Sequence, residues 1–193
     1  MENYKMILAA EEKMAREVTL GVIVTRPLTV WHYIIPGMFI IDFLRRGSAL
    51  RKYTDAFMFP RKLAIDAAQA LMQDDEKDKV YAHIESEIYA WLNSHELYTP
   101  GLQQAQLSVI KLLIDHYTKL LKEDGYSLYA VIEKAYQTRQ DSQAFSDKLT
   151  AAEAEVDSEL ISKKGESEKL KAKRSAEQEQ LKERREKIIE EVF

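Results

Sequence analysis

Histidine and glutamate residues give this chain its nearest approach to a metal or catalytic site. His83 and Glu87 are four residues apart, so on a helix they share one face and could both ligate a metal ion. His116 follows on the next expected helix. Di-metal helical bundles use Glu-x-x-His pairs, and the residues three positions before the two histidines are valine and leucine. We therefore favour ordinary bundle roles for these side chains. A metal or cofactor enzyme built on His83, Glu87 and His116 remains an alternative.

The sequence lacks the other motifs that indicate catalysis. There is no cysteine, which excludes disulfides, thiolate metal sites and cysteine nucleophiles. His95-Glu96 is not followed by a second histidine three residues later, and no glycine-rich phosphate loop or Gly-x-Ser-x-Gly is present. The net charge of −4 gives no overall basis for nucleic-acid binding. We predict no catalytic residue, no cofactor and a protein that is not an enzyme.

Helices are the elements that the pattern predicts, because glycine and proline are scarce and apolar residues recur every three or four positions. We find no useful alternation of the kind that strands show. The fold class is therefore predicted to be all-α. Pro60 is expected to interrupt one helix. The expected helices cover 2–24, 48–59, 61–72, 80–92, 102–124 and a long segment that begins at Ser127.

The chain divides by composition into two parts. Every aromatic residue except Phe193 lies within 1–150, whereas half of the residues in 151–193 are charged. A packed core needs large apolar side chains, so only the first part is expected to fold as a domain. We predict a helical domain over 1–150 and a charged arm over 151–193, which forms an extended helix or coiled coil. A solvated, fraying helix is the alternative for the arm.

Residues 28–46 form the most apolar stretch of the chain. The uncharged run from 27 to 41 is shorter than the roughly 20 residues that a membrane-spanning helix needs. Pro36 and Gly37 divide it, which leaves arms that reach about 12–15 Å at 1.5 Å per residue. The pattern therefore predicts a re-entrant or monotopic hairpin that enters one leaflet and leaves by the same face.

Two sets of side chains carry this membrane hypothesis. Aromatic residues favour the boundary between membrane and water, and a basic flank attracts anionic lipid on the cytoplasmic face. The expected inserting residues are Trp31, Tyr33, Ile34, Ile35, Pro36, Gly37, Met38, Phe39, Ile40, Ile41, Phe43 and Leu44. The expected headgroup-binding residues are Arg45, Arg46, Arg51, Lys52, Arg61 and Lys62.

Other interpretations of the apolar stretch stay open at this point. A helix that is apolar all round belongs either in a protein core or in a membrane, so the stretch could be the centre of a soluble bundle or a protein interface. A single tilted span is a third possibility. The favoured hypothesis is a non-catalytic adaptor or accessory subunit at the cytoplasmic face of a membrane. Lipid and a protein partner, or a second copy held by the C-terminal helix, are its expected partners. A soluble coiled-coil regulator is the main alternative.

Overall fold

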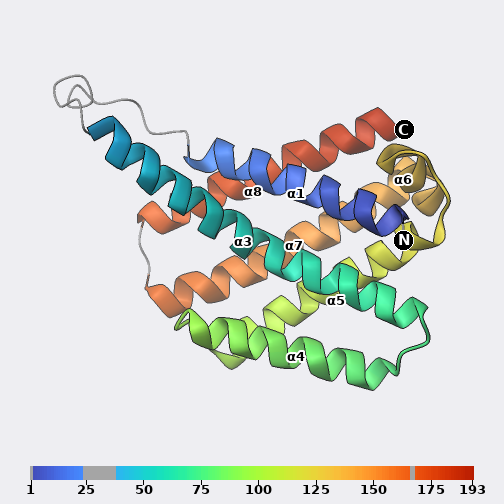
Figure 1. The fold of residues 1–193 in the computed structure, drawn as a ribbon, viewed down its shortest axis with the longest axis horizontal. Helices are drawn as coiled ribbons and strands as arrows, with labels where there is room; N and C mark the ends of the chain where they lie inside the picture. Colours follow the sequence, from blue (N-terminus) through green and yellow to red (C-terminus); the bar gives the residue numbers. More distant parts are fainter. Residues whose placement is uncertain (1, 24–37, 166–167) are drawn as a thin grey trace.

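The computed structural model describes residues 2–23, 38–165 and 168–193. Within these ranges the regular structure is helical and no strand occurs, which confirms the all-α prediction (Figure 1). Of the hairpin expected over 28–46, residues 28–37 lie outside the described residues. The helices are α1 (Glu2–Ile23), α3 (Met38–Met72), α4 (Lys77–Ser94), α5 (Pro100–Lys122), α6 (Leu128–Tyr136), α7 (Arg139–Lys164) and α8 (Glu168–Val192).

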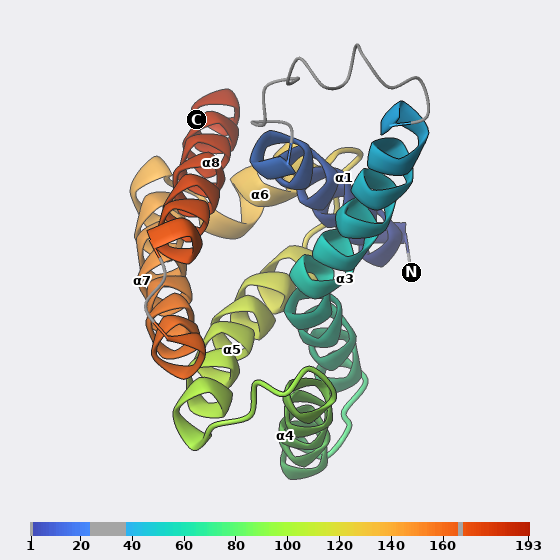
Figure 2. The ribbon, with the colours of Figure 1, turned by 90° about the vertical axis from the view of Figure 1, so that its left-hand side faces the viewer.

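Helix α5 is the centre of the bundle. It packs against α3 on one side and α7 on the other. Helix α1 lies along α3, and α8 lies along α7 and also meets α1, so the five long helices close into a ring (Figure 2). Helix α4 covers α3 and α5 from outside the ring, and α6 lies at one end of the bundle. This arrangement brings α1 and α8 side by side.

The core follows the apolar periodicity of the sequence. On α4, Ile84, Ile88 and Leu92 recur every four residues and are fully buried. On α5 the buried side chains include Ile110 and Tyr117. The helical faces expected over 80–92 and 102–124 are therefore confirmed. Helix α4 buries its apolar face against α3 and α5, and α5 buries its own against α3 and α7. This burial stabilises both helices, because an isolated helix of this length is marginal in water.

Capping residues fix where several helices begin. Thr99 and Ser127 accept hydrogen bonds from the backbone N–H groups of Leu102 and Ala130, at 3.0 and 3.2 Å. The long helix predicted from Ser127 is wrong, since it divides into α6 and α7. Gln137 has a positive φ of 58°, which ends α6, and the Thr138 side chain then caps α7 by accepting from Asp141 N–H at 3.1 Å.

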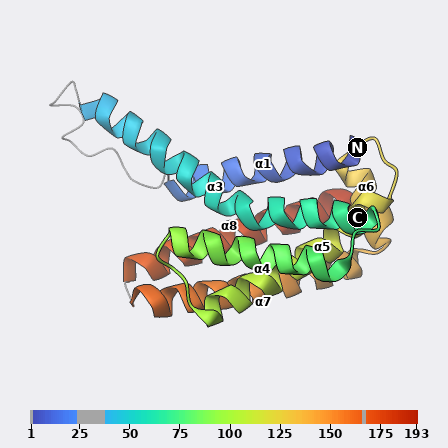
Figure 3. The same ribbon diagram turned by 60° about the horizontal axis from the view of Figure 1, so that its bottom comes forward.

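The interruption expected at Pro60 is also wrong. Helix α3 continues through this proline from 38 to 72, with a bend in its middle part (Figure 3). Packing on both sides of the proline compensates for the backbone hydrogen bond that a proline removes from a helix. Phe57 and Ala64 are buried on the two sides of it, and the guanidinium of Arg61 donates to the Phe57 carbonyl at 3.2 Å. The first turns of α3 extend beyond the ends of the neighbouring helices (Figures 1 and 3).

The C-terminal segment folds back onto the bundle. Gly165 follows α7 with a φ of 83°, a backbone conformation that side chains with a Cβ disfavour, and α8 then runs back along α7. Asp157 on α7 pairs with Arg174 at 3.3 Å and accepts from Gln178 at 3.0 Å. The structure does not show a projecting coiled-coil arm over 151–193. The boundary expected after residue 150 falls inside α7.

Candidate functional site

A cluster of buried charges lies in the middle of the ring and joins four helices. Arg61 on α3 is only 4% exposed, and its Nη2 donates to Glu153 Oε1 on α7 at 3.2 Å. Arg185 on α8 donates to both carboxylate oxygens of Glu153, at 2.7 and 2.8 Å. Glu11 on α1 lies opposite Arg61, with 3.1 Å between Oε2 and Nε. Two positive and two negative groups therefore balance one another inside the bundle.

The pKa directions of Glu153 and Arg61 indicate that these two groups stay ionised. Burial alone would raise the pKa of Glu153, but Arg185 and Arg61 outweigh it and the net shift is downward. Burial alone would lower the pKa of Arg61, yet Glu11 and Glu153 raise it overall. Removing one member would leave an uncompensated charge in the interior, which is far costlier than burying the complete set.

Further polar and aromatic groups complete the cluster. Tyr117 donates to Glu11 Oε1 at 2.9 Å, and the guanidinium of Arg61 lies 3.7 Å from the centre of the Phe57 ring. Glu11 Oε2 and Arg61 Nε attract each other as charges, but their orientation is not that of a hydrogen bond. Glu11 Oε2 therefore has no hydrogen-bond donor among the described residues.

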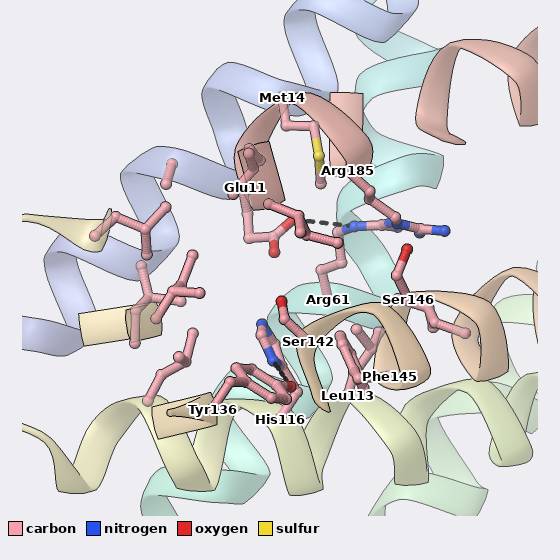
Figure 4. A pocket seen from close by; sticks show the side chains of 18 residues that line it. Glu11, Met14, Arg61, Leu113, His116, Tyr136, Ser142, Phe145, Ser146 and Arg185 are labelled. Atoms are coloured by element: carbon pink, nitrogen blue, oxygen red, sulfur yellow. Dashed lines mark hydrogen bonds and ion pairs between the residues drawn. The ribbon is translucent and has the colours of Figure 1, made fainter. Parts of the chain in front are cut away.

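A cavity of about 120 Å³ opens beside this cluster (Figure 4). Side chains from α1, α3, α5, α6, α7 and α8 line it, so it forms only when the ring is closed. Most of its wall is apolar, and its polar groups come from the charge cluster, one histidine, one tyrosine and two serines. The lining residues are Ile7, Ala10, Glu11, Met14, Arg61, Leu113, His116, Leu120, Leu128, Ile132, Tyr136, Ser142, Phe145, Ser146, Leu149, Arg185, Ile188 and Ile189.

His116 forms the polar floor of the cavity. Its Nδ1 lies 2.6 Å from Tyr136 Oη, and its ring stacks on Phe145 with 4.4 Å between ring centres. Burial, with Arg185 and Lys119 nearby, lowers the pKa of His116 to about 3, so the imidazole is neutral. Burial also raises the pKa of Tyr136, which keeps its hydroxyl protonated. The other ring nitrogen of His116 points into the cavity (Figure 4).

This arrangement suits binding better than proton transfer. A general base works best when its pKa lies near the ambient pH, and the pKa of His116 is far below that range. The neutral ring can instead donate or accept one hydrogen bond toward the cavity. The carboxylate of Glu11 lies on the same wall, but its Oε2 is fully buried beside Arg61 and its Oε1 accepts from Tyr117.

The three metal candidates do not come together. His116 faces α6 and α7 through Tyr136 and Phe145. His83 and Glu87 are exposed on α4, and His83 lies beside Leu63 and Asp66 of α3. Within the described ranges, no group of three or more histidine, aspartate or glutamate side chains is placed to hold a metal ion. His83 and Glu87 do share one face of α4, as their spacing predicts, but His116 on α5 points to a different side of the bundle.

The expected membrane residues fall in three groups. Trp31, Tyr33, Ile34, Ile35, Pro36 and Gly37 lie outside the described residues. The inserting residues from Met38 to Leu44, together with Arg45 and Arg46, belong to the projecting start of α3. Arg51, Lys52 and Lys62 are exposed on α3, as a headgroup contact requires. None of the described helices combines the length and the apolarity that crossing a bilayer requires.

Arg61 corrects the expected headgroup set. Its side chain is buried and paired with Glu11 and Glu153, so it cannot reach a lipid headgroup from this position. The basic run was read as one surface, but neighbouring residues on a helix point about 100° apart, and Arg61 points inward while Lys62 points outward.

The sequence reasoning missed Glu11, Glu153 and Arg185. A signal existed for Arg185, which stands midway between Leu181 and Ile189 at four-residue spacing and therefore shares their buried face. A charged residue on the buried face of a helix needs an oppositely charged partner in the interior. Which residue that partner is depends on how distant helices pack.

No protein-family model matches the chain, and comparisons with curated proteins and with solved structures find none similar to it.

Proposed function

We propose that the chain is a non-catalytic adaptor or accessory subunit, anchored in one leaflet at the cytoplasmic face of a membrane. The observation that carries this proposal is the position of the apolar stretch. Its described part, residues 38–46, forms the first turns of α3, which extend beyond the bundle. A segment at a projecting end can reach a bilayer while the helical ring stays in water.

The described part of α3 supports the same geometry. Arg51 and Lys52 are exposed close to the projecting end, where their charges would meet anionic headgroups at about 1 kcal/mol each. The ring also has its own core, because Ile65, Ile110 and Leu113 belong to one cluster of buried side chains. Partner binding is proposed for the outward face of α8, because Leu181 and Ile189 on its inward face are used within the bundle.

Vesicle flotation with the full chain tests the anchor. We expect the protein to float with vesicles that contain anionic phospholipid, to resist release by high salt and to be released by detergent. Ile35→Asp combined with Phe39→Asp should leave the protein in the soluble fraction with unchanged helicity and thermal unfolding. The matched control is Tyr89→Asp combined with Tyr126→Asp, which adds the same charge at exposed aromatic residues, 51% and 97% exposed.

The competing soluble-core hypothesis gives the opposite result. Buried aspartates at positions 35 and 39 would unfold or aggregate the chain, and wild-type protein would stay out of the vesicle fraction. For the partner surface, crosslinking in native membranes should map to the exposed residues Lys182 and Lys187. Crosslinks that avoid α8 altogether would contradict that assignment.

A further inference from the structure

The cavity beside the charge cluster has the dimensions of a small-ligand site. Its volume is about 120 Å³. In another protein an apolar cavity of about 150 Å³ holds benzene, so the space here fits one six-membered ring or a group of similar size. Water alone could also occupy it, at roughly four molecules of ~30 Å³ each. The chemistry of the wall distinguishes these occupants.

The wall charges favour an uncharged occupant. Arg61 and Arg185 are already neutralised by Glu11 and Glu153, and all four groups lie within or beside the wall. An anion would lie near the Glu11 carboxylate, and a cation near the two guanidinium groups, so either would upset a balanced set. The remaining surface is dominated by side chains such as Leu113 and Leu149, which suits a ring or a short hydrocarbon group.

One polar atom indicates a hydrogen-bonding group on that occupant. A nitrogen of the neutral His116 ring points into the cavity (Figure 4). This nitrogen donates or accepts according to whether Tyr136 donates to Nδ1 or accepts from it. A hydroxyl group suits both tautomers, because it can accept as well as donate. Glu11 Oε2 takes no part, because it is fully buried and lies 3.1 Å from Arg61 Nε.

We propose that this cavity binds a small uncharged ring compound that carries one hydroxyl group, of the size of phenol. The ring lies among the leucine side chains and Phe145, and the hydroxyl lies against the His116 ring nitrogen that points into the cavity. This site is independent of the anchor, because the residues that line it come from the closed ring and none from the apolar stretch.

Calorimetric titration of the full chain tests the site, with phenol, benzene and benzoate as probes. Phenol should bind several-fold more tightly than benzene, because a hydrogen bond to the His116 imidazole adds to the apolar contact. Benzoate should show no binding. Absence of phenol binding at millimolar concentration, or equal binding of benzoate, would overturn the proposal and leave a hydrated cavity.

Two variants on α7 locate the binding. Ser142 is buried and lines the cavity, so Ser142→Leu should fill it and abolish phenol binding. Ala144 is exposed on the same helix, and Ala144→Leu should leave binding unchanged. Retention of binding in both variants would contradict the site. Should Ser142→Leu fail to fold, His116→Phe decides: phenol affinity should fall several-fold while benzene affinity is unchanged, and an unaltered preference for phenol would refute the proposed contact.

Discussion

The partly buried imidazole of His116 makes stability depend on pH in a predictable direction. Its pKa is about 3 in the folded chain, against an ordinary value of 6.5 that the unfolded chain regains. Between these values the unfolded chain binds one more proton than the folded chain, so stability falls as the pH falls. The stabilising contribution is complete above pH 6.5 and is lost as the pH approaches 3.

The size of the effect follows from the same two pKa values. Each pH unit below the unfolded pKa costs about 1.4 kcal/mol, so lowering the pH from about 7 to about 4.5 should cost about 2–3 kcal/mol through this residue alone. Glu153 adds an acid-dependent loss of the same sign, because its pKa is lowered on folding and its stabilisation disappears as the pH falls through the folded value. A comparison between variants is therefore needed to isolate the imidazole.

His116→Gln provides that comparison, since the amide keeps a polar group near Tyr136 and does not titrate. Urea unfolding at both pH values gives the loss of unfolding free energy for each protein. The loss in His116→Gln should be about 2–3 kcal/mol smaller than in wild type. His83→Gln removes an exposed histidine and should behave as wild type. Equal losses in wild type and His116→Gln would refute the reasoning, whatever the absolute stability of the variant.

Two further predictions concern the closure of the ring. Glu153→Gln leaves two buried guanidinium groups without their shared carboxylate and should lower the unfolding free energy by about 3–5 kcal/mol in urea titration; the exposed Glu155→Gln should change it by less than about 0.5 kcal/mol. Leu181→Ala removes a buried side chain where α8 packs and should cost about 2–5 kcal/mol by the same measurement. Lys182→Ala at the exposed neighbouring position should be nearly neutral, and an equal loss in both variants would show that α8 is not docked through Leu181.

Much of the fold could be predicted from local sequence pattern. The spacing of Ile84, Ile88 and Leu92 fixes which face of α4 is buried, because four residues return to the same side of a helix. Local sequence pattern did not predict the helix boundaries that depend on contacts between distant parts of the chain. Helix α3 continues through Pro60 because its neighbours are held on both sides by packing, and α6 ends at Gln137 in a left-handed conformation that glutamine does not signal.

The candidate site was harder to predict for a related reason. A charged residue on a helix is expected to be exposed to solvent unless a buried partner is known. The partners of Arg61 are Glu11, 50 residues earlier on α1, and Glu153, 92 residues later on α7. His116 was noticed as a potential ligand, but its actual neighbours, Tyr136 and Phe145, belong to helices that the sequence pattern had merged into one. Pairing between distant segments is information that periodicity does not contain.

The contact of Glu153 with both Arg61 and Arg185 has a consequence for the order of events during synthesis. The ribosome delivers α1, α3 and α7 before α8, so Arg61 and the two carboxylates can meet while Arg185 is still untranslated or inside the exit tunnel. At that stage the nascent interior carries one excess negative charge, and the partly formed ring is accordingly unfavourable to close. Emergence of α8 removes the imbalance, which couples the synthesis of this helix to closure of the core.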